Sequence, residues 1–143
     1  MLEPRGACGL VAVALFGAGA CSDEEPAVEP KWEIVLDDLD ASAFSVWGSA
    51  ADDVWVVGAD DGTGPLILRY DGTDWVRMQS GVEGDLWWVS GRGDDVWMSG
   101  EAGMILRYSR KRDEFESFPV ETASILFGIF PVANNDVWAV GGD

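Results

Sequence analysis

From Lys31 onward, short apolar runs alternate with polar breaks along the chain. Each run is rich in β-branched and aromatic residues and is bounded by Gly, Asp, Asn or Ser. Runs of this length and composition predict β-strands, and no segment shows the 3.6-residue period of an amphipathic helix. The pattern therefore predicts an all-β fold.

One phrase recurs three times in this region, as DDVWVVG, DDVWMSG and NDVWAVG. Its tryptophan returns after 42 and then 41 residues, as Trp55, Trp97 and Trp138. A fixed period of this size is typical of four-stranded repeat units such as propeller blades, none of which can bury both of its faces alone. Within the phrase, we expect the acidic residues to cap turns and the tryptophan to pack between neighbouring units.

Aligning the copies predicts two complete four-stranded units and half of a third. The strands of the first unit are AFSVWGS, DVWVVGA, PLILRYD and TDWVRMQ, those of the second are DLWWVSG, DVWMSGE, MILRYSR and EFESFPV, and the third has ILFGIFPV and DVWAVG. The segment KWEIVLDD matches the fourth strands, because Trp32 aligns with Trp75 and Phe115. It is predicted to be a lone outer strand contributed to another blade.

These phrases resemble the propeller repeats of bacterial cell-envelope proteins, in which DVWAVG is followed by ILRYDG and then by Trp. The resemblance covers residues 31–143 and extends to kelch-like repeats and, through YDGTDW, to Asp-box-like repeats. The kelch double glycine occurs only at Gly141 and Gly142, and the Asp-box serine is absent. The resemblance implies a partial β-propeller of about two and a half four-stranded blades plus an N-terminal outer strand. It implies no particular activity, because such folds carry many functions.

Closed propellers have about 4 to 8 blades. We therefore expect the 143 residues to be a fragment of a longer protein, with an unpaired strand edge and an uncovered apolar face around Trp138. Expressed alone, such a chain is expected to be oligomeric or poorly soluble.

The N-terminus carries a second signal. An uncharged run of small and apolar residues extends from Gly6 to Cys21, too short to cross a bilayer core of roughly 30 Å. It predicts a signal peptide over residues 1–20 and export to the cell envelope. The end of the run resembles a bacterial lipoprotein signal, which implies a lipid on Cys21 and a membrane anchor. A secretory signal cut after Ala20 is the alternative, since Ala18 stands where lipoproteins usually have Leu. Residues 21–30 predict an acidic tether.

The formal net charge of −17 disfavours nucleic acid as a partner. The chain has no histidine, so no imidazole base or zinc site is predicted, and the loop ADDGTGP offers too few oxygens for calcium. No metal, cofactor or catalytic residue is therefore assigned. The basic segment SRKRDE predicts a solvated turn, or a local contact with an acidic neighbour.

One position is singled out as a candidate ligand site. Counting back from the repeated tryptophans places Trp87 where the other units have Ser45 and Gly128, on the strand that lines the channel of a propeller. Trp87 is interpreted either as a plug that fills uneven packing or as a stacking platform for a ligand such as a sugar.

Together these observations predict a non-catalytic, exported binding or scaffold protein with a glycan or protein ligand. The alternative is a fragment of a propeller enzyme, a glycan hydrolase or lyase, whose catalytic residues lie in missing blades.

Overall fold

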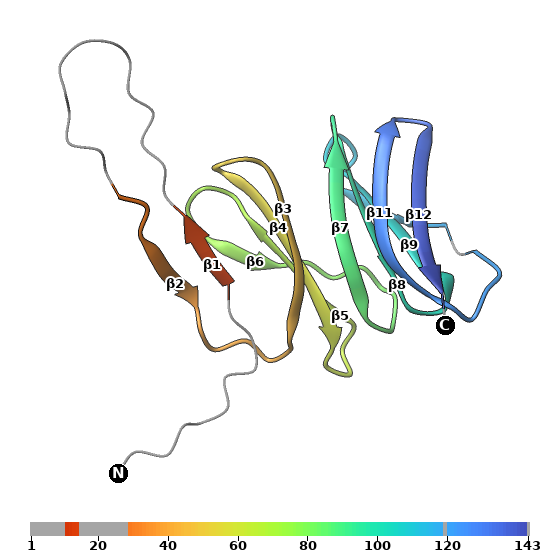
Figure 1. Cartoon of the computed structure of the whole chain (residues 1–143), viewed down its shortest axis with the longest axis horizontal. Coiled ribbons are helices and arrows are strands. Elements are labelled where there is room, and N and C mark those ends of the chain that lie inside the picture. Colours follow the sequence, from red (N-terminus) through yellow and green to blue (C-terminus); the bar gives the residue numbers. More distant parts are fainter. Residues whose placement is uncertain (1–10, 15–28, 119, 143) are drawn as a thin grey trace. The chain divides into compact units, whose positions relative to one another are not determined.

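The computed structural model describes residues 11–14, 29–118 and 120–142. Regular structure in these ranges is strand, apart from one 3-10 turn, η1 (Glu101–Gly103), so the all-β prediction is confirmed. The chain divides into two compact units, residues 1–40 and residues 41–143, which are taken separately below (Figure 1).

Unit 1 holds a two-stranded antiparallel sheet. The strand expected around Trp32 is present as β2 (Trp32–Leu36), and it pairs with β1 (Val11–Ala14). In this structure β2 is therefore not a lone strand, and its partner β1 lies in the segment predicted to be a signal peptide. Cys21, the rest of the signal segment and most of the tether lie outside the described residues.

Unit 2 contains three antiparallel sheets, each a meander in chain order. The two complete units and the half unit predicted from the repeats are all present, and none of the sheets closes on itself. The first sheet has β3 (Ala43–Ala50), β4 (Asp53–Asp60), β5 (Pro65–Tyr70) and β6 (Trp75–Arg77); the second has β7 (Leu86–Arg92), β8 (Asp95–Gly100), β9 (Ile105–Ser109) and β10 (Glu114–Ser117); the third has β11 (Ile125–Ala133) and β12 (Asp136–Gly142).

The sheets of unit 2 pack in sequence order. Strand β7 contacts β3 on one side and β11 on the other, so the first strands of the three sheets are successive neighbours (Figure 1). Successive side chains on a strand point to opposite faces, so buried neighbours such as Trp55 and Val56, or Val96 and Trp97, place apolar side chains on both faces of the first two sheets. The main core joins the first two sheets through Trp55, Val57, Ile67, Leu86, Val89, Val96, Met98, Leu106 and Tyr108.

The exposure of the repeated tryptophan shows whether that face of each sheet is covered by a neighbouring sheet. Trp55 in β4 is 0% exposed and Trp97 in β8 is 7% exposed, as expected for residues packed between sheets. The equivalent Trp138 in β12 is 66% exposed, with Phe130 and Val140 also exposed beside it. The uncovered apolar face predicted at the third repeat is therefore present.

The junction between the first two sheets depends on one close approach to a glycine. Trp47 lies opposite Trp55 across β3 and β4. A Cβ atom added to Gly91 of β7 would lie 2.3 Å from Cη2 of the Trp47 ring, which is closer than side chains can come. The Trp47 indole therefore rests directly on the backbone of β7, and only glycine leaves room for it.

This packing predicts that Gly91→Val will lower the free energy of unfolding by about 1 to 3 kcal/mol, the usual cost of an overpacked core. Chemical denaturation followed by circular dichroism measures the loss. Gly142→Ala is the control, because an added Cβ there meets no atom within 4 Å. Shortening the opposing side chain with Trp47→Leu should recover part of the loss in the double variant. Equal stability of the Gly91 variant and wild type would contradict the packing described.

Candidate functional site

The first strand of every sheet in unit 2 carries a β-bulge at the same place. The pairing skips one residue between Ala43 and Ser45 in β3 while the partner strand advances by one, and the same step recurs in β7 and β11. The residue left without a cross-strand partner is aromatic each time: Phe44, Trp87 and Phe127. Bulges re-aim a side chain and are common beside functional sites.

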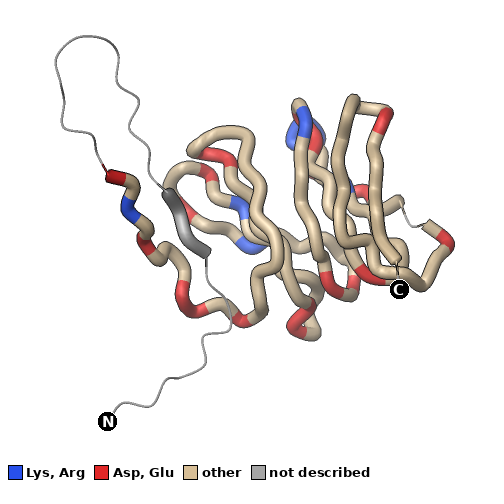
Figure 2. Tube along the Cα trace, in the orientation of Figure 1, with Lys and Arg blue, Asp and Glu red and all other residues tan. Residues whose placement is uncertain are grey.

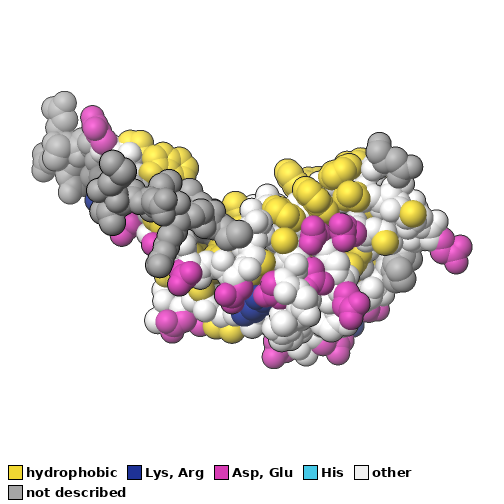
Figure 3. Space-filling view, turned by 90° about the horizontal axis from the view of Figure 1, so that it is seen from below, with side chains coloured by type: hydrophobic (Ala, Val, Ile, Leu, Met, Phe, Trp, Pro, Cys, Tyr) yellow, Lys and Arg dark blue, Asp and Glu magenta, His cyan; other side chains and the backbone are white. Residues whose placement is uncertain are grey.

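These three residues, which we call the aromatic row, contact one another across the sheets. The rings of Phe44 and Trp87 are stacked, with centroids 4.7 Å apart and an interplanar angle of 17°. Phe127 meets Trp87 edge-on at 5.8 Å. Phe44 is 39% exposed and Phe127 is 47% exposed, whereas Trp87 between them is half-buried. A space-filling view shows hydrophobic side chains gathered in a surface patch on unit 2, next to acidic residues (Figure 3).

The strand register corrects the alignment that singled out Trp87. Ser45 and Gly128 pair with Val57 and Val140, and their equivalent in the second sheet is Trp88, which pairs with Ser99. Trp88, 47% exposed, is therefore the large residue whose counterparts are small, and Trp87 belongs to a uniformly aromatic position.

The error has an identifiable cause. Strands β3 and β11 each contain a second bulge, at Ser49 and at Val132, whereas β7 has none. Counting a fixed number of residues back from the repeated tryptophan therefore lands one position too early in β7.

The two interpretations of Trp87, a packing residue or a stacking platform for a ligand, can now be considered for each ring of the aromatic row. The indole nitrogen of Trp87 is enclosed and has no hydrogen-bond partner within the described part of the chain. This enclosure and the stacked Phe44 ring fit a packing role for Trp87 itself. The exposed rings of Phe44 and Phe127 at either end are the ones open to a ligand.

The acidic residue of the first repeat phrase ties two sheets together. Asp53 is buried and accepts hydrogen bonds from the Ser49 hydroxyl at 2.5 Å and the Trp55 indole at 3.1 Å. It also pairs at 2.6 Å with Arg110, in the turn that follows β9 of the second sheet, and Arg110 in turn donates to the carbonyl of Gly93. The expectation that the acidic residues of the phrase cap turns is not met at Asp53, because the donors to its carboxylate are side chains. The contact of Arg110 with Asp53 spans 57 residues, so it is not the local contact expected of the basic segment; Arg112 makes a local one, with Glu114 at 2.6 Å.

The loop ADDGTGP forms a second link between the same sheets. One oxygen of Asp60 accepts backbone N–H groups of Gly62 and Gly64, at 2.7 and 3.0 Å, and the other accepts that of Gly84 at 2.7 Å. Asp61 pairs with Arg77 at 2.7 Å. Among the described residues, no group of three or more metal-ligating side chains is placed to hold an ion. Acidic residues mark many of the turns in Figure 2.

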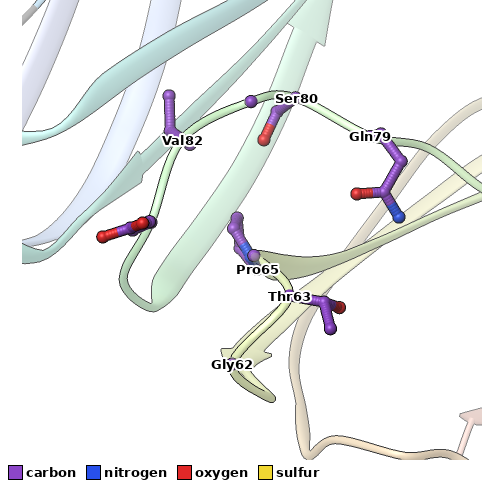
Figure 4. A pocket seen from close by; sticks show the side chains of 9 residues that line it. Gly62, Thr63, Pro65, Gln79, Ser80 and Val82 are labelled. Atoms are coloured by element: carbon purple, nitrogen blue, oxygen red, sulfur yellow. The ribbon is translucent and has the colours of Figure 1, made fainter.

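A shallow pocket lies beside this loop, between the β4–β5 hairpin and the β6–β7 connection (Figure 4). It has a volume of about 280 Å³ and is lined by residues 62–65 and 79–83. Its polar groups come from Thr63, Gln79, Ser80 and Glu83, and Glu83 is the one ionisable side chain in the lining. The pocket is separate from the aromatic row, because none of the residues of that row lines it.

We found no significant match to the chain among protein-family models, curated proteins or solved structures. Within the described ranges, the chain forms no helix with the length and hydropathy needed to span a membrane.

The junction at Asp53 makes a pH dependence predictable. Burial disfavours the charged carboxylate, but hydrogen bonds from Ser49 and Trp55 and the charges of Arg110 and Arg69 outweigh it. The pKa of Asp53 therefore lies below its ordinary value of 3.8. A lowered folded-state pKa means that the stabilisation is fully present above about pH 4 and is lost as the pH falls through the folded value.

We expect the free energy of unfolding to decline below about pH 4, and to decline less in Asp53→Asn than in wild type. Urea titrations between pH 2 and 7 measure both slopes. Arg110→Ala, combined with Asp53→Asn in a double-mutant cycle at pH 7, should give a coupling of about 1 to 2 kcal/mol. Additive effects of the two substitutions would show that this pair does not join the sheets.

Proposed function

We propose that this chain belongs to a non-catalytic binding or scaffold protein of the bacterial cell envelope, built from β-propeller repeats, exported, and anchored by a lipid on Cys21. The aromatic row is the observation that carries the binding role. It brings one aromatic side chain from each repeat to one continuous strip, and two of its three rings are exposed.

The arrangement of the sheets supports the propeller part of the proposal. The three sheets have the same strand order, pack face to face, and keep their first strands next to one another. In a propeller the first strands line the central channel. Continued around a ring, β3, β7 and β11 would line that channel, and the aromatic row would lie along its wall.

The chemistry of the row favours ligands with an apolar or π-rich face. An exposed aromatic ring stacks well on the face of a sugar or on another aromatic group, and clusters of such rings mark binding surfaces. A glycan or an aromatic-rich protein segment is the ligand class proposed. The buried and half-buried carboxylates described above already accept hydrogen bonds at turns and sheet junctions, which supports structural roles for them over the enzyme alternative.

Glycan arrays and soluble cell-wall fragments test the binding role directly. Phe44→Ala and Phe127→Ala should each weaken a wild-type hit by about tenfold or more, since each removes a stacking surface. Val46→Ala removes an apolar group from the same strand as Phe44, is 61% exposed, and should leave binding unchanged. Trp87→Ala should lose about 2 to 3 kcal/mol of stability, because its ring is half-buried and stacked. A wild-type chain that binds nothing on the arrays would remove the glycan as a ligand of the aromatic row and leave a protein segment as the one class to test.

The anchoring part of the proposal concerns Cys21. Mass spectrometry of membrane-fraction protein should show a mature N-terminus at Cys21 that carries a diacylglyceryl group, and Cys21→Ser should move the protein to the soluble fraction. An unmodified Cys21 thiol in wild-type protein would contradict the anchor while leaving the aromatic row untouched.

A further inference from the structure

The pocket beside the loop ADDGTGP lies where the first repeat departs from the second. This loop has seven residues, whereas EAG, its equivalent between β8 and β9, has three. In the second repeat the short loop bonds directly to the connection after β10, because the Gly103 N–H donates to Ser124 and its carbonyl accepts from Val120, both at 3.0 Å. In the first repeat no hydrogen bond joins residues 62–65 to residues 79–83, and the pocket lies between these segments.

Hydrogen bonds fix the loop side of the pocket. Asp61 accepts both the N–H and the hydroxyl of Thr63, at 2.9 and 2.6 Å. Arg77, which pairs with Asp61, also donates to the Gly64 carbonyl at 3.1 Å. Together with the bonds to Asp60 described above, these contacts give the loop a defined shape before any ligand binds.

The opposite side of the pocket, the connection at residues 79–83, is held at its ends and from below. The Met78 N–H donates to a carbonyl of β5 at 2.8 Å, and the Gly84 N–H donates to Asp60 at 2.7 Å. Val82 packs against the main core. In the part of the chain that the structure describes, residues 79–83 themselves form no hydrogen bond or ion pair. Their polar groups are therefore open to a ligand, although the segment itself is anchored.

The open groups of the pocket both donate and accept hydrogen bonds. The side chains of Gln79 and Ser80 point from the connection toward the loop, and an amide or a hydroxyl can act in either sense (Figure 4). Pro65 and Val82 add apolar surface, and no aromatic ring lines the pocket. Glu83 is negative, and with the net charge of −17 it disfavours an anion. The lining therefore favours a neutral ligand rich in hydroxyl groups.

The size of the pocket limits the ligand to a small unit. The two sides meet at Gly64, where an added Cβ would lie 3.1 Å from the Val82 carbonyl oxygen. The volume of about 280 Å³ lies just below the range of about 300 to 1,000 Å³ that is typical of small-molecule sites. Because the pocket is also shallow, the end unit of a longer chain can enter it while the rest of that chain stays in solvent.

We propose that this pocket binds one neutral sugar unit at the end of a glycan, through the side chains of Gln79 and Ser80 and the free N–H groups of residues 79–83. The ordered loop and the anchored connection form the site in advance, so binding requires little rearrangement. This site is separate from the aromatic row and does not depend on the ligand proposed there.

Amide NMR of the full chain tests the site with sugars of known composition. The neutral probes are the methyl glycosides of glucose, galactose and N-acetylglucosamine, and glucuronic acid is the matched anionic sugar. At least one neutral probe should cause saturable shifts of the amides of residues 62–64 and 79–83. Glucuronic acid should cause none there, because Glu83 repels its carboxylate.

Variants of the full chain test the contacts. Ser80→Trp fills the pocket and should abolish these shifts, whereas Ser117→Trp places the same side chain on an exposed position of β10 outside the pocket and should leave them unchanged. Gln79→Ala should weaken the neutral sugar about fivefold, the effect of losing one hydrogen bond. Circular dichroism should show intact folds, since all three positions lie at the surface.

The outcomes separate this site from the aromatic row. Shifts confined to Phe44, Trp87 and Phe127 and their neighbours would overturn the pocket as a sugar site while leaving the ligand role of the row intact. Stronger binding of glucuronic acid than of the neutral probes, or unchanged binding in Ser80→Trp, would also overturn it. So would the absence of shifts with every neutral probe at high millimolar concentration.

Discussion

Everything in unit 2 follows from sheets that are apolar on both faces. A soluble antiparallel sheet normally keeps one polar face toward water, but here the residues of β4 and β8 are buried on both sides. Stacking the sheets in sequence order covers both faces of the second sheet, which lies between the other two, and leaves one face of the third sheet exposed around Trp138. The hydrophobic term supplies the attraction but has no direction. Orientation comes from Trp47 on the backbone of Gly91 and from Asp53 and Asp60, whose hydrogen bonds to the next sheet are directional.

Polar groups at the junctions fix the orientation of the sheets, whereas the apolar core holds the sheets together. Asp53 lies at one end of β4 and Asp60 at the other, and each is bonded to a segment that adjoins a strand of the second sheet, Arg110 after β9 and Gly84 before β7. Two fixed points at opposite ends of a strand leave little freedom for one sheet to rotate on the other. Most acidic residues look like surface charges in the sequence, but Asp53 and Asp60 hold the first sheet in its orientation against the second.

Features of the fold that depend on neighbouring residues in the sequence could be predicted, and features that depend on contacts between distant residues could not. Strand positions in unit 2 followed from apolar runs and turn residues, and the exposure of Trp138 followed from counting repeats. The bulges could not be predicted from the sequence. One extra residue in β3 and in β11 shifts the strand register, but these strands still look like ordinary apolar β-strands in the sequence. The partner of Asp53 was also out of reach, since Arg110 is 57 residues away and only the stacking of the sheets brings the two together. The pairing of β2 with β1 was missed because β1 lies in a segment assigned to a signal.

The close contact at Gly91 also settles in which order the repeats can be stacked. In the register of the next pair of sheets, the position equivalent to Trp47 is Ser90 and the position equivalent to Gly91 is Pro131. The large side chain and the glycine that accommodates it therefore occur together at the first junction alone among the described repeats. If the first sheet were stacked on the third, the indole of Trp47 would meet the position of a proline instead of a glycine. Sequences that repeat so closely risk pairing the wrong copies while they fold, and these complementary volumes penalise the wrong pairing.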